Sequence, residues 1–155
     1  MRWPSIALSA LLCCALMVAE AGCKTGGAAK ISKVLPHLLD AQGRHTPSPS
    51  LYERDAYQAH LRAHPEEVGG LRFEVQWRST VYYLTGMKLR LELRGSKEPR
   101  VVVLEHAVEK RPWYQRWTSF ELDRATFDRL GEVVAWRASL WDGDRLLAEQ
   151  SSFLW

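Results

Sequence analysis

The sequence predicts a mainly β protein, an antiparallel sandwich of six or seven strands with one helix near its start. Apolar and polar residues alternate with a period of two in 71–77 (LRFEVQW) and in 87–94 (MKLRLELR), which is typical of antiparallel strands with one wet face. Turn signals recur at intervals suited to a β-sandwich, most clearly in 142–144 (DGD). The segment 51–63 contains neither glycine nor proline and is rich in helix-forming residues, so it predicts the helix.

Composition limits the classes of protein to consider. The chain has 155 residues, of which 46% are hydrophobic and 25% charged, so it can bury a core and is not globally disordered. Its net charge is +3 with both signs interspersed, which excludes the dense basic surface of a nucleic-acid-binding protein. All three cysteines, Cys13, Cys14 and Cys23, precede the folded part, which therefore has no disulfide framework and no thiolate metal site.

The first 22 residues are typical of a secretory signal peptide. Arg2 precedes an uncharged, mostly apolar run of 14 residues at 6–19. A helix of that length spans about 21 Å, which is less than the roughly 30 Å of a bilayer's hydrocarbon core. We therefore expect residues 1–22 to be a signal peptide and the protein to be exported.

Two cleavage sites are compatible with the end of this segment. The motif AEA at 19–21 predicts cleavage before Gly22, which would release a soluble periplasmic protein. The motif AGC at 21–23 resembles the end of a bacterial lipobox, although Glu20 stands where that family has an apolar residue. The resemblance implies cleavage before Cys23 and acylation of its sulfur, with membrane lipid as the partner.

Two further observations favour the lipoprotein. Without acylation, Cys23 would be a lone exported thiol. The polar, flexible segment 23–30 is suited to a tether between a lipid and a domain. Lys24 follows the cysteine, and by resemblance to enteric lipoproteins this favours the outer membrane.

The remaining elements are expected in the following order. Segment 31–39 is a strand or extended arm, and Pro36 places it at a sheet edge because proline cannot donate to the ladder. Ser50 and Glu53 have capping-box spacing at the start of helix 51–63, and Pro65 ends that helix. A short helical crossover is expected at 123–131. The further strands are expected at 71–77, 87–94, 100–106, 117–122, 132–141 and 145–154.

This arrangement divides the mature chain into an arm and helix at 31–70 and a β-sandwich at 71–155. The strand pattern resembles the broad immunoglobulin-like or fibronectin-type class, without the cysteine pair of antibody domains. That resemblance implies a fold and no function. The ending at 135–155 (AWRASLWDGDRLLAEQSSFLW) also resembles that of small exported bacterial proteins, and this likeness carries no activity.

His60 and His64 are the candidate metal ligands, because two histidines four residues apart project from one helix face. HLRAH lacks the glutamate of the zincin motif, and Pro65 frays the helix at His64, so we expect a solvated helix end and no metal. His37 and His45 lie near serines in sequence, but no serine occupies a Gly-x-Ser-x-Gly elbow, so we expect no catalytic triad.

The segment EKRPWYQRW at 109–117 is the candidate binding surface. Cations alternate with aromatic rings there, and such a loop can stack on sugars, seat on a membrane interface or enter a protein partner. The residues concerned are Lys110, Arg111, Trp113, Tyr114 and Arg116. The reading that the sequence favours instead is structural: Trp117 enters the core and Trp113 covers an open sheet edge.

No motif in the chain has the spacing of a catalytic or cofactor site. We therefore expect a non-catalytic cell-envelope lipoprotein without a cofactor, a binding or assembly-support module with an envelope protein or glycan as partner. The alternatives are a metal-binding protein or enzyme that uses His60 and His64, and a soluble periplasmic carrier.

Overall fold

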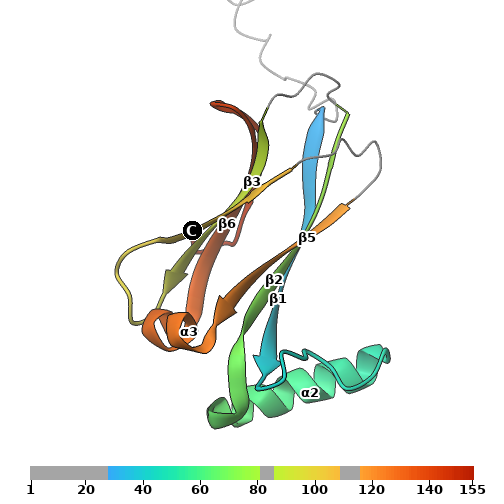
Figure 1. Ribbon diagram of the computed structural model, residues 1–155, viewed down its shortest axis with the longest axis vertical. Coiled ribbons are helices and arrows are strands. Elements are labelled where there is room, and N and C mark those ends of the chain that lie inside the picture. Colours follow the sequence, from blue (N-terminus) through green and yellow to red (C-terminus); the bar gives the residue numbers. More distant parts are fainter. Residues whose placement is uncertain (1–27, 81–85, 109–115) are drawn as a thin grey trace, which may run out of the picture.

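The computed structural model describes residues 28–80, 86–108 and 116–155, and shows a mainly β protein with two facing antiparallel sheets (Figure 1). One sheet has the strand order β1-β2-β5 and the other has the order β4-β3-β6-β7. The elements are β1 (Ala29–Asp40), α2 (Leu51–Ala63), η1 (Pro65–Glu67), β2 (Val68–Ser79), β3 (Met87–Gly95), β4 (Val102–Ala107), β5 (Arg116–Asp123), α3 (Arg124–Leu130), β6 (Val133–Asp142) and β7 (Arg145–Ser151). The prediction of a mainly β, antiparallel two-sheet fold with a helix at 51–63 is confirmed.

The core lies between the sheets and follows the alternation in the sequence. On β2 the side chains of Phe73, Val75 and Trp77 are buried, and the polar residues between them face outward. The leucines of β3 meet them from the opposite sheet, and Leu89 and Leu91 are fully buried. Burial of these alternate side chains on both inner faces is what stabilises the sandwich.

Strand β1 is an edge strand, as Pro36 predicts. It pairs with β2 over almost its whole length, from Ala29 opposite Ser79 to Asp40 opposite Val68. In an antiparallel strand the N–H and C=O of one residue point to the same side, and those of the next residue point to the other. The backbone of Leu38 bonds to α2 on the free side, so Pro36, two residues earlier, also faces that side and offers no N–H there.

Both helices lie at one end of the sandwich (Figure 1). The Ser50 side chain accepts a hydrogen bond from the N–H of Glu53 at the start of α2, which confirms Ser50 as the N-cap. The N–H of Ser50 donates to the Ser48 hydroxyl at 3.1 Å, so the reciprocal half of the predicted capping box is made by Ser48 and not by Glu53. The Asp123 carboxylate accepts from the N–H of Thr126 at the start of α3. We call this end, formed by α2, η1 and α3, the helical end.

The opposite end holds the start of β1, and we call it the N-terminal end. The N–H of Thr80 donates to the carbonyl of Ala28 at 2.7 Å, which fixes the first described residue beside the end of β2. The N–H of Val108 donates to the carbonyl of Met87 at 2.8 Å, which places the end of β4 beside the start of β3. Figure 1 shows the start of β1 at the end opposite α2 and α3.

Gly95 permits a close approach between β3 and α3. A Cβ atom at this position would lie 2.0 Å from the carbonyl oxygen of Leu130 and 2.5 Å from its side chain. We expect Gly95→Ala to lower the free energy of unfolding by about 1–3 kcal/mol, because the backbone of Leu130 must shift. Urea denaturation measures this change. Gly86→Ala is no clean control, because Gly86 has a φ of +90°; Ala107→Gly, at an exposed strand end, serves instead.

Two expectations about the second half of the chain are wrong. Trp117 is 47% exposed, whereas Thr118 and Phe120 on the same strand are buried. The inward positions of β5 are thus the even-numbered ones, so Trp117 does not enter the core. The strand expected at 145–154 is also shorter than predicted, because β7 ends at Ser151. Beyond it the chain turns, and the N–H of Trp155 donates to the carbonyl of Ser152.

Candidate functional site

A cavity of about 770 Å³ opens between the sheets at the helical end. Its apolar wall comes from α2, β2, α3 and β6, and consists of Leu61, Leu71, Phe73, Phe127, Val133 and Trp136. Leu61 is fully buried and closes the wall from the side of α2. Cavities of this volume with mostly apolar walls are typical of sites for small molecules.

Residues of α2, η1 and α3 line the cavity together with the two sheets. Strands β1 and β5 are both antiparallel to β2, so they run in the same direction and end on the same side of their sheet. The segments that contain α2 and α3 follow these two strand ends. Arg124 at the start of α3 donates to the carbonyl of Pro65 at 2.8 Å and also to the carbonyl of Val68. These bonds join α3 to η1 and hold the two sides of the cavity together.

Gln58 fixes α2 against the edge of β1. Its Oε1 accepts from the N–H of Leu38 at 2.8 Å, and its Nε2 donates to the carbonyl of Leu38 at 2.9 Å. The same Nε2 donates to the carbonyl of His45 at 2.8 Å. Gln58 is buried and takes the place that a neighbouring strand would have beside Leu38.

Polar groups surround the mouth of the cavity. The side chains of Arg62 and Lys97 are exposed and line it, together with Arg124, Asp128 and Glu132. The Arg124 guanidinium pairs with the Asp128 carboxylate at 2.8 Å. Lys97 Nζ donates to the carbonyl of Asp128 at 3.4 Å. The Asp128 carboxylate is thus already paired with Arg124. Glu132 is the other carboxylate in the lining, beside the two cations Arg62 and Lys97.

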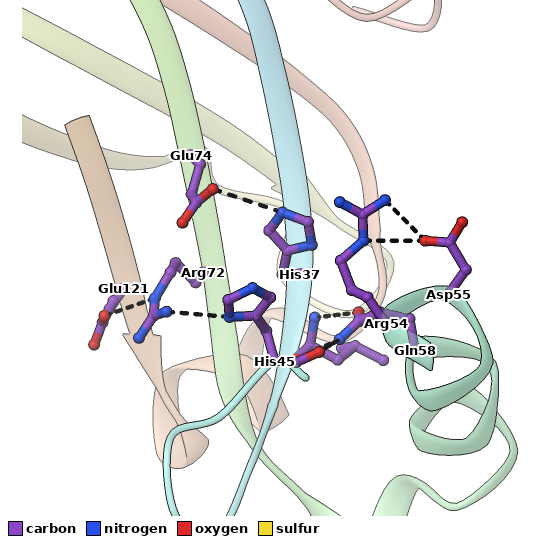
Figure 2. A network of polar contacts seen from close by, with 9 residues as sticks. His37, His45, Arg54, Asp55, Gln58, Arg72, Glu74 and Glu121 are labelled. Atoms are coloured by element: carbon purple, nitrogen blue, oxygen red, sulfur yellow. Dashed lines mark hydrogen bonds and ion pairs between the residues drawn. The ribbon is translucent and has the colours of Figure 1, made fainter. Parts of the chain in front are cut away.

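A second feature is a polar cluster on the outer face of the β1-β2-β5 sheet (Figure 2). His37 Nε2 lies 3.8 Å from a carboxylate oxygen of Glu74, and the rings of His37 and His45 have centroids 5.0 Å apart. Figure 2 shows Arg72 between His45 and Glu121, and Arg72 Nε donates to Glu121 at 2.8 Å. The cluster packs the loop after β1 onto the sheet beside α2.

The electrostatics of this cluster favour neutral His37. Burial lowers the pKa of His37 below its ordinary value of 6.5, and Glu74 offsets this only in part. The guanidinium groups of Arg54 and Arg72 near the ring lower the pKa of His37 further. Uncharged His37 is therefore the form that the folded chain stabilises.

This pKa shift predicts a pH dependence of stability. Because the folded-state pKa lies below 6.5, the unfolded chain binds the proton more readily, and the stability present above 6.5 is lost as the pH falls toward the folded-state value. We expect urea midpoints to fall between about pH 7 and pH 5. His37→Gln should flatten this slope, and His64→Gln, at the exposed end of α2, should not. Equal slopes in both variants would contradict this role of His37.

Asp40 organises the turn that leads from β1 into the loop. Burial would raise the pKa of its carboxyl, but hydrogen bonds from the backbone N–H of Arg44, the Tyr57 hydroxyl, the Arg44 side chain and the N–H of Gln42 outweigh burial and lower the pKa to about 2. The stabilisation is present above the unfolded value of 3.8 and is lost as the pH falls from there to about 2. Through Tyr57, this carboxylate also ties α2 to β1.

The structure gives His60 and His64 other partners. Their rings stack with centroids 4.2 Å apart and planes 27° apart, so their in-plane nitrogen lone pairs do not converge on one point. His60 Nε2 lies 2.9 Å from Glu67 Oε2, and His64 Nδ1 lies 2.9 Å from the carbonyl of His60. Within 28–80, 86–108 and 116–155, no three His, Cys, Asp or Glu side chains are grouped to hold a metal ion.

Most of the candidate surface at 109–117 lies outside the described residues, as do Lys110, Arg111, Trp113, Tyr114 and the acylation candidate Cys23. Arg116 and Trp117 are described, and they line a pocket of about 400 Å³ at the N-terminal end with Trp77, His106 and Val108. In the described part of the chain, no helix is long and apolar enough to cross a membrane.

The outer face of the four-stranded sheet is occupied by its own ion pairs and ring contacts. Arg90 pairs with Glu105 at 2.6 Å, and Arg137 with Glu92 at 2.7 Å. The Trp155 ring lies under two guanidinium groups, those of Arg94 at 4.4 Å and Arg137 at 4.8 Å. Because these charges are paired within the sheet, this face is a poorer candidate for a ligand than the cavity.

Comparison with known proteins adds no assignment. No protein-family model matches the chain, and a search of curated proteins finds no significant match.

The cavity and its attachment through Gln58 were not predicted from the sequence. The available signal was small: Gln58 lies next to Tyr57 and three residues before Leu61 on the helix, so it is close to the apolar stripe. Lys97 lies in a turn between two strands, where no pattern distinguishes a ligand-binding cation from a solvated one.

Proposed function

We propose that this protein is an exported, non-catalytic binding module of the cell envelope, anchored in the membrane through acylated Cys23. Its N-terminal end faces the membrane, and its helical end presents the cavity to a ligand or partner. The observation that carries the proposal is the placement of the cavity at the end opposite the start of β1.

The strand order supports an immunoglobulin-like sandwich of the fibronectin type. The first, second and fifth strands form one sheet, and the third, sixth and seventh lie in the other. The fourth strand pairs with the third. Such sandwiches carry binding sites at their ends, where loops and connections gather, while the sheets provide a rigid support.

The length of the tether supports the orientation. Four residues separate Cys23 from Ala28, and even when fully extended the five Cα-to-Cα steps between them span only about 17 Å. An acyl chain on Cys23 would therefore hold the N-terminal end close to the headgroups. The strands that lead away from it, such as the ten-residue β6, are about 30 Å long.

The same orientation assigns a partner to the aromatic and basic segment. Val108, which follows β4, and Arg116, which begins β5, flank 109–115 and lie at the N-terminal end. The sequence from 109 to 117 contains Lys110, Arg111, Trp113, Tyr114 and Arg116. Aromatic rings and cations are favoured at a membrane–water interface, so we propose that this surface contacts lipid headgroups.

Processing of the precursor tests the anchor. Globomycin, which blocks lipoprotein signal peptidase, is expected to cause the precursor to accumulate, and Cys23→Ser is expected to move the mature chain from the membrane fraction to the soluble fraction. Cys14→Ser is the matched control, because it removes a thiol that lies within the signal peptide. Unchanged processing with globomycin would instead favour the soluble periplasmic carrier.

A further inference from the structure

We propose that the cavity at the helical end binds a free long-chain fatty acid, with the acyl chain between the sheets and the carboxylate at Lys97 and Arg62. This inference deepens the proposed function, since it rests on the helical end being the binding end. It commits to a ligand with one acyl chain and one negative charge.

The interior of the cavity is suited to an alkyl chain. Its wall combines Leu38 and Leu71 of the first sheet with the rings of Phe127 and Trp136. Phe127, Val133 and Trp136 are only partly buried although they pack against the core, so apolar surface remains available inside the cavity. Each methylene group of a ligand that leaves water for such a surface contributes favourably to binding.

The charges at the mouth favour a carboxylate. Three cations and two carboxylates line the cavity, and the pair formed by Arg124 and Asp128 is already satisfied. In the part of the chain that the structure describes, neither Arg62 nor Lys97 forms an ion pair with a carboxylate. These two exposed cations exceed the one remaining acid, Glu132, so the mouth attracts a negative headgroup.

The edge of β1 argues against a peptide strand as the occupant. A peptide would have to add to the free side of β1 next to the cavity. Gln58 already occupies the N–H and C=O of Leu38 there, and Pro36 has no N–H to offer. An acyl chain needs no backbone partner, so the same edge does not hinder it.

Displacement of a fluorescent fatty acid tests the proposal. The full chain carrying Cys23→Ser is purified without detergent, and dansyl-labelled undecanoic acid is added as the probe. Energy transfer from tryptophan, Trp136 in the cavity wall included, is expected to report binding. Palmitate should displace the probe, and hexadecanol, with the same number of carbons and no charge, should be at least about tenfold weaker.

Charge reversal tests whether the cations at the mouth of the cavity, and not cations elsewhere on the surface, bind the carboxylate. The double variant Arg62→Glu and Lys97→Glu is expected to weaken palmitate binding by at least about tenfold and to leave hexadecanol unchanged. The matched control reverses two exposed cations away from the cavity, Lys33→Glu and Arg145→Glu, and should bind palmitate normally. Val133→Trp, which fills the cavity, should abolish binding of both compounds.

Three results would overturn the proposal: no displacement by palmitate, equal displacement by palmitate and hexadecanol, or equal loss of affinity in the two charge-reversal pairs. The binding experiments do not depend on the membrane anchor. If palmitate does not bind but globomycin blocks processing, the fatty-acid proposal is wrong and the anchored module stands. If palmitate binds as expected but globomycin has no effect on processing, the anchor is wrong and the fatty-acid site stands.

Discussion

Trp77→Ala is expected to lower the free energy of unfolding by about 4 kcal/mol, the largest loss of any single substitution considered for this protein. The Trp77 ring is 1% exposed and belongs to the core between the sheets, and its removal leaves a cavity that the surrounding strands cannot close. Its Nε1 also donates to the Thr118 hydroxyl at 2.9 Å, so the variant leaves a buried hydroxyl without this donor. Urea denaturation followed by circular dichroism measures the change.

Two further variants separate these contributions. Trp77→Phe keeps most of the apolar volume and removes the hydrogen bond, so we expect a loss of about 1–2 kcal/mol. Trp117→Ala is the matched control, because its ring is 47% exposed on the neighbouring strand, and it should cost less than about 1 kcal/mol. A loss at Trp117 as large as that at Trp77 would show that the inward positions of β5 are assigned wrongly.

Gln58→Ala is expected to lower the free energy of unfolding by about 3 kcal/mol and to loosen α2 from the sheet. The substitution leaves the N–H and C=O of Leu38 and the C=O of His45 without the amide that now satisfies them. Few other bonds hold α2, among them the one from the Tyr57 hydroxyl to Asp40. Since α2 forms one wall of the cavity, we also expect weaker binding of palmitate.

Amide hydrogen exchange at Leu38 is the most direct readout of this variant. Its N–H is protected by the Gln58 side chain, so exchange should be faster in Gln58→Ala by at least about tenfold. Asp55→Ala on the exposed face of the same helix is the control and should exchange as the unmodified chain does. Unchanged exchange at Leu38 in Gln58→Ala would contradict the role given to this amide.

Strands with strict alternation were predictable because one physical cause determines them. In 71–77 and 87–94 each side chain is either in the core or in water, so the period of two determines both the secondary structure and the buried face. The helix at 51–63 was predictable for a similar reason, because Ser50 caps it and Pro65 follows its end.

Strand β5 shows how a single large residue can mislead. Its sequence RWTSFELD places Trp117 next to Thr118, and the larger apolar residue was assigned to the core. Thr118 lies inside instead, on the same face as Phe120 and Leu122, and its hydroxyl accepts a hydrogen bond from Trp77. The period of two set by Phe120 and Leu122 determines the buried face, whereas the size of the Trp117 ring does not.

The cavity could also not be predicted from the sequence. Residues of α2 and α3 line it, and Gln58 and Arg124 attach these helices through bonds to backbone carbonyls in distant segments. Every residue type can supply a backbone carbonyl, so the sequence carries no sign of these partners. Only this arrangement brings the site residues Arg62 and Lys97 to the lining of one cavity.

The orientation proposed for an anchored module can be measured directly with fluorescent labels in lipid vesicles. After cleavage before Cys23 the chain would contain no other cysteine, and the Cys23 sulfur would be acylated, so an engineered cysteine would take up the label alone. One label is placed at the N-terminal end with Asp144→Cys and one on α2 with Tyr52→Cys, both at exposed positions. A quencher attached to the lipid headgroups should strongly quench the label at residue 144 and leave the label at residue 52 bright. Equal quenching at both positions, or stronger quenching at residue 52, would contradict the account.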